Sequence, residues 1–244
     1  MICELKMPVK PEQTDSLGRL KMWAILYFAQ EAAGAHAASL GAGWEELQKK
    51  NLFWAVIRTR VEVENGVCGD EITVKTWPMP TSRTAYPRCV MGYSKDGQLL
   101  FKLVSLWVLM DVNSRVMVLP GKSGVEVLGS VEGDEPQQPK GLPFAEQKHT
   151  CYKTVEQCHL DKNGHMNNTR YMDWVMELAG EKTVENVELC YFNEGRFGDQ
   201  MELSYTLTEE TLSVNIHRTG TDDEPAKDRV FAAQLRFSVN QQLH

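Results

Sequence analysis

The chain has 244 residues, of which 42% are hydrophobic and 24% charged, a balance that is ordinary for a soluble globular protein of one large or two small domains. Its net charge of −7 argues against nucleic acid as a partner and against a general basic membrane-binding surface. No apolar run approaches the roughly 20 residues of a membrane-spanning helix, and the N-terminal residues do not resemble a secretory signal. The six cysteines form no Cys-x-x-Cys pair and the histidines lack metal-ligand spacing, so we expect reduced thiols, no metal and a cytoplasmic protein.

The first third of the chain predicts an edge strand followed by a long helix. Residues 3–14 are expected to form the edge strand, because Pro8 and Pro11 would each remove a hydrogen-bond donor from a central strand. Residues 22–38 form a helix that is apolar on nearly every side, which is typical of a buried helix wrapped by a sheet. A shorter helix is expected at 44–50.

From Phe53 onward the apolar residues recur with a period of two, which indicates strands. The expected strands are 53–64, 71–77, 84–94 and 98–111. Lys95-Asp-Gly between the last two is a hairpin turn signal. A long helix followed by antiparallel strands is an α+β unit.

Residues 119–148 are expected to be a linker, because this stretch carries four of the ten prolines, several glycines and an acidic patch. Beyond the linker the same order of elements returns, with a strand at 151–158, a polar loop and a helix at 168–181. Further strands are expected at 186–194, 200–207, 211–218 and 229–239. The sequence therefore predicts two tandem α+β units, 1–118 and 149–244.

The polar loop of the second unit runs directly into its helix and concentrates chemically useful groups. Asp161, Asn163 and His165 alternate along it. Asn167 or Asn168 can cap the helix, which would leave free backbone N–H groups and the positive end of the helix dipole beside the loop. Such a site can hold developing negative charge on oxygen. The alternative is that Asp-x-Asn-Gly is turn chemistry alone and His165 a surface residue.

The loop repeats an earlier segment of the chain. Asp15 and Gly18 fall on Asp161 and Gly164 at an offset of 146 residues, and a helix follows in both copies. If the two copies share a fold, the residues they share are those that the turn requires. Asp161 is therefore a weaker catalytic candidate than its neighbours, because turn geometry alone could explain it.

The residues that differ between the copies are the candidates for chemistry. A second repeat, at an offset of 129, aligns 65–70 with 194–199. Three differences stand out: Asn163 against Leu17, His165 against Arg19, and Glu194 against Asn65. Asn163, His165 and Glu194 occur only in the second copy.

These residues resemble the acyl-acyl carrier protein (acyl-ACP) thioesterases of fatty acid synthesis, over nearly the whole chain. The motifs that carry the resemblance are Asp161-x-Asn163-x-His165-x-Asn167-Asn168-x-x-Tyr171-x-x-Trp174, Tyr191-Phe-Asn-Glu194, Gln30-Glu-Ala-Ala-Gly-x-His36, Trp54 and Trp107-Val-Leu-Met-Asp111. The resemblance implies two hotdog units in one chain, each a long helix wrapped by an antiparallel sheet, and no cofactor. The chain lacks the long N-terminal transit segment of plastid members, so it looks like the bacterial, cytoplasmic type.

In that family the loop residues and a glutamate on a neighbouring strand are the proposed catalytic set. They correspond here to Asp161, Asn163, His165 and Glu194. Plant members often carry a cysteine directly after the glutamate, whereas this chain has Gly195, so we expect no cysteine nucleophile. Asp161 either orients its neighbours or attacks the thioester itself through an anhydride.

The resemblance implies hydrolysis of a fatty acyl thioester on acyl carrier protein, which releases a free fatty acid. Glu194 and His165 would position and deprotonate water, while Asn163 and helical N–H groups would hold the oxyanion. The first unit, which lacks the polar set, is free to form the acyl-chain pocket. The expected substrate-binding residues are Trp23, Leu26 and Phe28 in the first unit and Asn167 and Asn168 in the second.

Three other functions remain open on the sequence. An acyl-CoA thioesterase would use the same residues, a hotdog 3-hydroxyacyl dehydratase could use His36, and a non-catalytic module could bind the acyl chain. His36 is expected to make a structural hydrogen bond instead. Exposed sheet edges or helix faces could support a homodimer.

Overall fold

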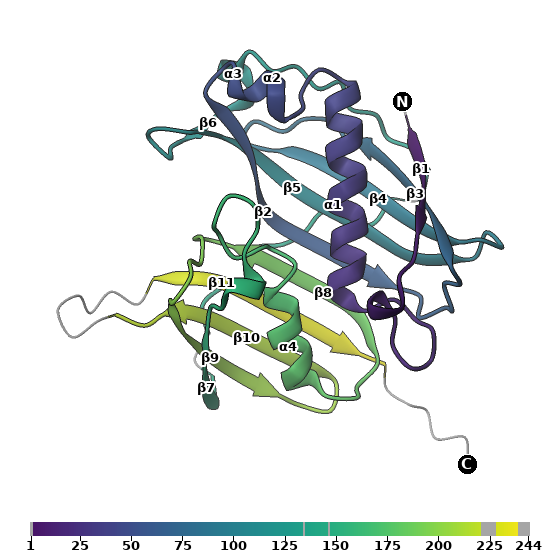
Figure 1. Ribbon diagram of the computed structural model, residues 1–244, viewed down its shortest axis with the longest axis vertical. Helices are drawn as coiled ribbons and strands as arrows, with labels where there is room; N and C mark the ends of the chain where they lie inside the picture. Colours follow the sequence, from purple (N-terminus) through teal and green to yellow (C-terminus); the bar gives the residue numbers. More distant parts are fainter. Residues whose placement is uncertain (1, 134, 146, 221–227, 239–244) are drawn as a thin grey trace. The chain divides into compact units, whose positions relative to one another are not determined.

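The computed structural model describes residues 2–133, 135–145, 147–220 and 228–238. It divides into two compact units, Met1–Pro139 and Lys140–His244, each with an antiparallel sheet and a helix (Figure 1). This is the α+β arrangement that the sequence predicted. None of the helices in the described part of the chain is both long and apolar enough to cross a membrane.

The sheet of the first unit has the strand order β1-β3-β4-β5-β2, with antiparallel neighbours and a short β6 paired to β5. The strands are β1 Cys3–Pro8, β2 Leu52–Val63, β3 Glu71–Pro78, β4 Tyr86–Ser94, β5 Leu99–Asp111 and β6 Met117–Val118. The prediction of an edge strand in this region is confirmed, but the predicted range 3–14 is longer than the observed strand. It ends at Pro8, and Pro11 opens the 3-10 helix η1 Pro11–Gln13, because proline suits the first position of a helix.

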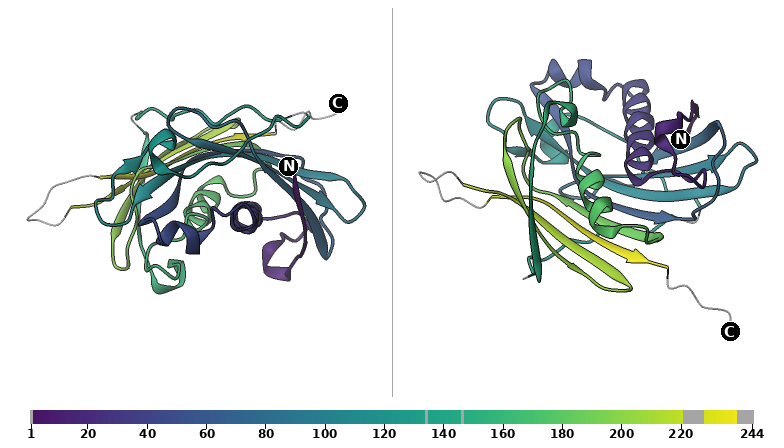
Figure 2. Two further views of the ribbon diagram at one scale, coloured as in Figure 1. Left: turned by 90° about the horizontal axis from the view of Figure 1, so that it is seen from above. Right: turned by 60° about the horizontal axis from the view of Figure 1, so that its bottom comes forward.

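Helix α1 Met22–Ser39 lies along the concave side of this sheet and packs against β1, β3 and β4 (Figure 2). The expected packing of this helix against the sheet is confirmed, but the helix is not buried all round. Because the sheet covers only one side of the helix, the other carries an exposed stripe. The exposed residues include Tyr27, Gln30, Glu31, Gly34 and Ala38.

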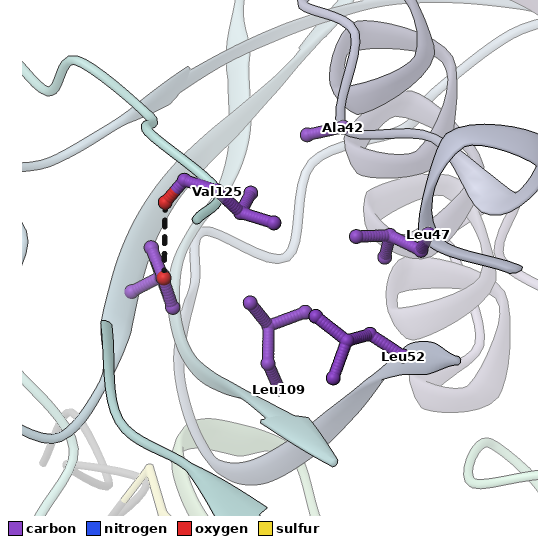
Figure 3. Packing of buried hydrophobic residues seen from close by; sticks show 6 residues of the cluster. Ala42, Leu47, Leu52, Leu109 and Val125 are labelled. Carbon is purple, nitrogen blue, oxygen red and sulfur yellow. Dashed lines mark hydrogen bonds between the residues drawn. The ribbon is translucent and has the colours of Figure 1, made fainter. Parts of the chain in front are cut away.

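A separate apolar cluster closes the end of the first unit where the short helices lie. Helix α2 Trp44–Gln48 contributes Leu47, and helix α3 Pro120–Ser123 leads through Gly124 into Val125. The clustered residues are Ala42, Leu47, Leu52, Tyr86, Leu109 and Val125 (Figure 3). Residues 120–125 of the expected linker therefore pack on the first unit.

The sheet of the second unit has the order β8-β11-β10-β9-β7, again antiparallel. Its strands are β7 His149–Thr154, β8 Val184–Tyr191, β9 Gln200–Leu207, β10 Thr211–Arg218 and β11 Arg229–Phe237. The strand expected at 151–158 is wrong at its end, because the 3-10 helix η2 Gln157–His159 follows Thr154. Helix α4 Tyr171–Ala179 packs onto β11 through Tyr171, whose ring stacks on Phe231 at 4.9 Å between centroids.

The repeat seen in the sequence is also a repeat of local structure. At an offset of 146, β1 and η1 fall on β7 and η2. At an offset of 129, β3 falls on β9 residue for residue. The helices are the main departure, since α1 has 18 residues and α4 has 9.

Candidate active site

The Asp161 carboxylate organises the polar loop of the second unit. Its Oδ1 accepts the backbone N–H groups of Asn163 at 2.8 Å and His165 at 3.2 Å. Gly164 lies in the left-handed region at φ +78°, and its N–H donates to the Asp161 carbonyl at 3.1 Å. These hydrogen bonds fix the backbone from which the side chains of Asn163 and His165 project.

The first unit contains the same turn with other side chains. Asp15 Oδ1 accepts the N–H groups of Leu17 and Arg19, both at 2.9 Å, and Gly18 has φ +74°. Burial raises the pKa of Asp15, but the hydrogen bonds from Arg19 and Leu17 and the charge of Arg19 outweigh it, so the net pKa lies below the usual value. The repeated hydrogen bonds show that the shared aspartate is a requirement of the turn.

A second loop meets the first through the backbone. His165 forms an isolated β-bridge with Arg196, and the Met166 N–H donates to the Gly195 carbonyl at 2.8 Å. This pairing sets the His165 Nε2 atom 3.2 Å from Glu194 Oε2. The His165 side chain is 18% exposed and that of Glu194 is 42% exposed, so the pair is reachable from solvent. Two sequence candidates separated by 29 residues are thus in direct contact.

Tyr171 holds the segment that carries Glu194, a role that the sequence analysis missed. Its hydroxyl accepts the Gly195 N–H at 3.1 Å, and the Arg218 guanidinium donates to the Glu194 carbonyl. Burial raises the pKa of Tyr171 well above the usual range, so the phenol stays neutral. The sequence signal was the tyrosine itself, a residue with a polar hydroxyl at a core position of the helix.

Asn163 projects from the exposed tip of the loop. Its Nδ2 lies 3.4 Å from Asp161 Oδ2, a weak contact that orients the amide. The amide nitrogen carries two N–H donors, so one can serve the carboxylate and one a ligand.

The predicted helix cap at Asn167 or Asn168 is wrong. The N-cap of α4 is Arg170, which makes no side-chain cap hydrogen bond. Asn167 Oδ1 instead accepts the N–H and O–H of Thr169, both at 3.0 Å, while the Asn168 carbonyl accepts from Tyr191 at 3.4 Å. The side-chain bond at Asn167 closes a separate turn, so the helix starts later than its apolar pattern indicated.

The residues expected to line an acyl pocket lie on α1 of the first unit. Phe28 is 1% exposed and Leu26 is 6% exposed, so both are core residues, whereas Trp23 is half-buried. Over the ranges that the structure describes, no group of His, Cys, Asp or Glu side chains is arranged to hold a metal ion.

Comparison with family models identifies both units. Residues 2–119 match the acyl-ACP thioesterase N-terminal domain, and residues 144–232 match the acyl-ACP thioesterase C-terminal domain. The chain belongs to the acyl-ACP thioesterase family. Among curated relatives of this thioesterase-family chain, the palmitoyl-acyl carrier protein thioesterase of Gossypium hirsutum is 31% identical, over 66% of this chain and 43% of the relative. The oleoyl-acyl carrier protein thioesterase 1 of Arabidopsis thaliana is 25% identical, over 96% of this chain and 71% of the relative. The match spans less than half the length of the palmitoyl relative.

Solved acyl-ACP thioesterase structures share the fold over nearly the full length. An acyl-ACP thioesterase from Bacteroides thetaiotaomicron is 23% identical with a TM-score of 0.85, covering 97% of this chain and 98% of that one. The 12:0-ACP thioesterase from Umbellularia californica is 21% identical with a TM-score of 0.77, covering 97% of each chain. The predicted fold of two tandem hotdog units is therefore confirmed.

This chain has Gly195 where plant-type members often carry a cysteine, and the surrounding atoms leave little space for a side chain. A Cβ atom added at Gly195 would lie 2.9 Å from the Tyr171 hydroxyl oxygen and 3.1 Å from Met201 Cε. In this chain the space after Glu194 is therefore occupied by Tyr171, and a larger residue would need local rearrangement.

Proposed function

We propose that this chain hydrolyses the thioester of fatty acyl-acyl carrier protein and releases a free fatty acid. The proposed catalytic residues are Asp161, Asn163, His165 and Glu194. The observation that carries the proposal is the contact of 3.2 Å between His165 Nε2 and Glu194 Oε2, whose equivalent positions in the first unit hold Arg19 and Asn65.

Water activation is assigned to this pair. A carboxylate beside an imidazole can hold a water molecule and accept its proton as the water attacks the thioester carbonyl. General base catalysis of this kind typically contributes roughly 10²- to 10⁴-fold in rate. The thiolate is a good leaving group, so the demand for acid catalysis at the sulfur is small.

Asn163 is assigned to the oxyanion. Its exposed amide stands two residues from His165 and can donate to the carbonyl oxygen as that oxygen gains negative charge. Asp161 is assigned a positioning role, because its Oδ1 already accepts two backbone N–H groups, as Asp15 does in the first unit. This assignment favours orientation over attack by Asp161 on the thioester.

Acyl carrier protein is the proposed acyl donor, because the curated relatives are named as acyl carrier protein thioesterases or hydrolases. The first unit is proposed to hold the acyl chain, with half-buried Trp23 as a contact and Leu26 and Phe28 as the supporting core. Asn167 and Asn168 are proposed to border the thioester. All six cysteines are free thiols, which suits the reducing cytoplasm.

The test is thiol release from a panel of acyl-ACPs and the matching acyl-CoAs, C8 to C18, with wild type beside His165→Ala. We expect hydrolysis that strongly favours the carrier-protein substrates and is lost in the variant. Hydrolysis of CoA esters alone would keep the site and change the donor. Absence of hydrolysis with both donors would overturn the proposal.

A further inference from the structure

A row of polar side chains crosses the interior of the first unit. The antiparallel register places Arg88 on β4 opposite Ser105 on β5, and Ser105 opposite Thr59 on β2. Directly opposed residues point to the same face of a sheet. Their exposures are 7%, 5% and 4%, so all three are buried. An acyl-chain pocket built on this face would not be uniformly apolar.

Helix α1 adds a histidine to this row. His36 Nδ1 lies 3.1 Å from a terminal nitrogen of Arg88, and the same nitrogen donates to Thr76 Oγ1 at 3.2 Å. Burial lowers the pKa of Arg88 to about 10, so the guanidinium stays charged at neutral pH. Burial and the charge of Arg88 lower the pKa of His36, so the imidazole accepts as a neutral ring. The predicted structural hydrogen bond of His36 is thus present.

The described residues bond only part of the Arg88 guanidinium. A guanidinium has five N–H donors, and His36 and Thr76 account for two of them. Among the described residues, no carboxylate forms an ion pair with Arg88. A buried charge normally requires a partner of opposite charge or a full set of hydrogen bonds.

The fold itself does not require polar residues in this row. Strands β3 and β9 correspond at an offset of 129, so Pro78 corresponds to Leu207. Pro78 pairs with Arg88 and Leu207 pairs with Leu212, so Leu212 is the counterpart of Arg88 in the second unit. The row in the second unit consists of Leu212, Leu235 and Val187, each 0% exposed. The same sheet position is therefore stable when it is wholly apolar. His36 comes from the later turns of α1, which have no counterpart in the shorter α4.

An arginine of the second unit shows what a structural role looks like in this protein. The Arg229 guanidinium donates to the carbonyls of Leu142 and Pro143 at 3.0 and 3.3 Å and to Asn215 Oδ1 at 2.6 Å. It also lies 4.3 Å from the ring centroid of Phe192. Arg229 has three oxygen acceptors, although its buried Nε has no hydrogen-bond partner, whereas Arg88 has one oxygen acceptor among the described residues.

We propose that Arg88, together with His36 and Thr76, binds an oxygen substituent on the fatty acyl chain. The first unit thereby selects acyl chains that carry a hydroxyl, oxo or carboxyl group beyond the thioester. This rests on the proposed function, in which the first unit holds the acyl chain. The remaining guanidinium donors supply the hydrogen bonds, and a substituent oxygen supplies an acceptor that none of the described residues provides.

The experiment compares kcat/KM for length-matched acyl-ACPs that are unsubstituted, ω-hydroxylated, ω-carboxylated or 3-hydroxylated. The variants are Arg88→Met, Arg88→Lys and, as a matched control, Arg83→Met at an exposed position of the same unit. In wild type, at least one oxygenated chain is hydrolysed in preference to the unsubstituted chain. Arg88→Met reduces that preference roughly 10- to 100-fold, as expected for loss of hydrogen bonds to a charged donor. Arg88→Lys keeps part of the preference and Arg83→Met keeps all of it.

A direct binding measurement separates this proposal from the proposed function. The melting temperature of wild type is measured with free ω-hydroxy and dicarboxylic acids, with unsubstituted fatty acids of equal length, and with inorganic phosphate. A larger shift with the oxygenated acids, lost in Arg88→Met, supports the site even if wild type hydrolyses no thioester. If Arg88→Met does not fold, Arg88→Lys and Thr76→Val provide the comparison.

Three results overturn the proposal. In the first, wild type neither hydrolyses nor binds oxygenated chains in preference to unsubstituted ones. In the second, substitution of Arg88 changes all chains equally, which identifies a structural arginine. In the third, phosphate alone stabilises wild type as much as the oxygenated acids do, which identifies a small-anion site.

Discussion

The turns at Asp15 and Asp161 have the same backbone and different chemistry. In each, an aspartate Oδ1 accepts two N–H groups and a glycine adopts a positive φ. The two side chains that the turn presents are Leu17 and Arg19 in the first unit, but Asn163 and His165 in the second. Arg19 donates back to Asp15 at 2.8 Å, whereas His165 contacts Glu194 on another loop. The fold therefore requires the turn in both units, whereas the proposed reaction requires only the side chains of the second turn, Asn163 and His165.

The largest expected difference between the two units comes from the contact between His165 and Glu194. We expect Glu194→Gln and His165→Ala each to lower kcat roughly 10²- to 10⁴-fold, because each removes half of the unit that activates water. Acyl-ACP hydrolysis measures the loss, and thermal unfolding checks the fold. Leu17→Ala, at a 63% exposed position of the other turn, serves as the control and leaves turnover unchanged. Wild-type rates in either site variant would contradict the assignment.

The next effect in size concerns Asn163. Replacing it with leucine, which the first unit carries at this position, is expected to lower kcat roughly 10²- to 10³-fold, because one oxyanion donor is lost. The turn should persist, since backbone N–H groups make its shorter hydrogen bonds and the Asn163 side chain adds only the weak contact of 3.4 Å to Asp161 Oδ2. Single-turnover hydrolysis with saturating acyl-ACP isolates the chemical step. An unchanged rate there would remove Asn163 from the oxyanion site.

Gly195 and Gly66 allow a matched test of the space around Glu194, since they correspond at the offset of 129. A Cβ at Gly195 meets the Tyr171 hydroxyl oxygen at 2.9 Å, whereas one at Gly66 meets the movable Gln98 amide at 2.9 Å. We expect Gly195→Cys to destabilise the fold by about 1–3 kcal/mol through overpacking and to lower turnover about tenfold. Gly66→Cys should lower both the stability and the turnover by less than Gly195→Cys does.

The double variant Gly195→Cys/Tyr171→Phe refines this test. If the Tyr171 hydroxyl is the obstacle, the double variant is more stable than Gly195→Cys alone in chemical denaturation. Strictly additive destabilisation would show that another contact limits the space.

The smallest expected effect is on the first turn and depends on pH. Asp15→Asn should reduce the free energy of unfolding by about 1 kcal/mol and leave kcat unchanged, because it weakens hydrogen bonds of the turn alone. The folded-state pKa of Asp15 is depressed, so its stabilisation is present above the usual value of 3.8 and is lost as pH falls through the folded value. Urea unfolding of both proteins should therefore differ at neutral pH and converge in acid. A constant difference at all pH values would contradict this linkage.

The sequence predicted the local repeat well, because turn residues act over a few positions. Gly18 and Gly164 marked both turns, and period-two patterns located the strands to within a few residues. The start of α4 was wrong because Asn167 forms a turn of its own with Thr169, a choice that apolar periodicity does not record. The exposed stripe of α1 was missed because small and apolar residues occupy part of it.

Contacts between distant parts of the chain were harder to predict. The repeat singled out His165 and Glu194 separately, but their contact depends on the pairing of two loops. The hydrogen bond from Gly195 to Tyr171 and the row through Arg88 depend on which strands and helices meet. These contacts depend on which residues pair across neighbouring strands and loops, and a single sequence does not show that pairing directly.

The most direct test of the central claim exchanges the side chains that the two turns present. Acyl-ACP hydrolysis and melting temperature are measured for Asn163→Leu/His165→Arg and for Leu17→Asn/Arg19→His. We predict that the first double variant keeps its fold and loses at least roughly 10²-fold in turnover, while the second keeps its turnover. Substantial activity in the first variant, or a comparable loss in the second, would show that chemistry does not reside in the second turn.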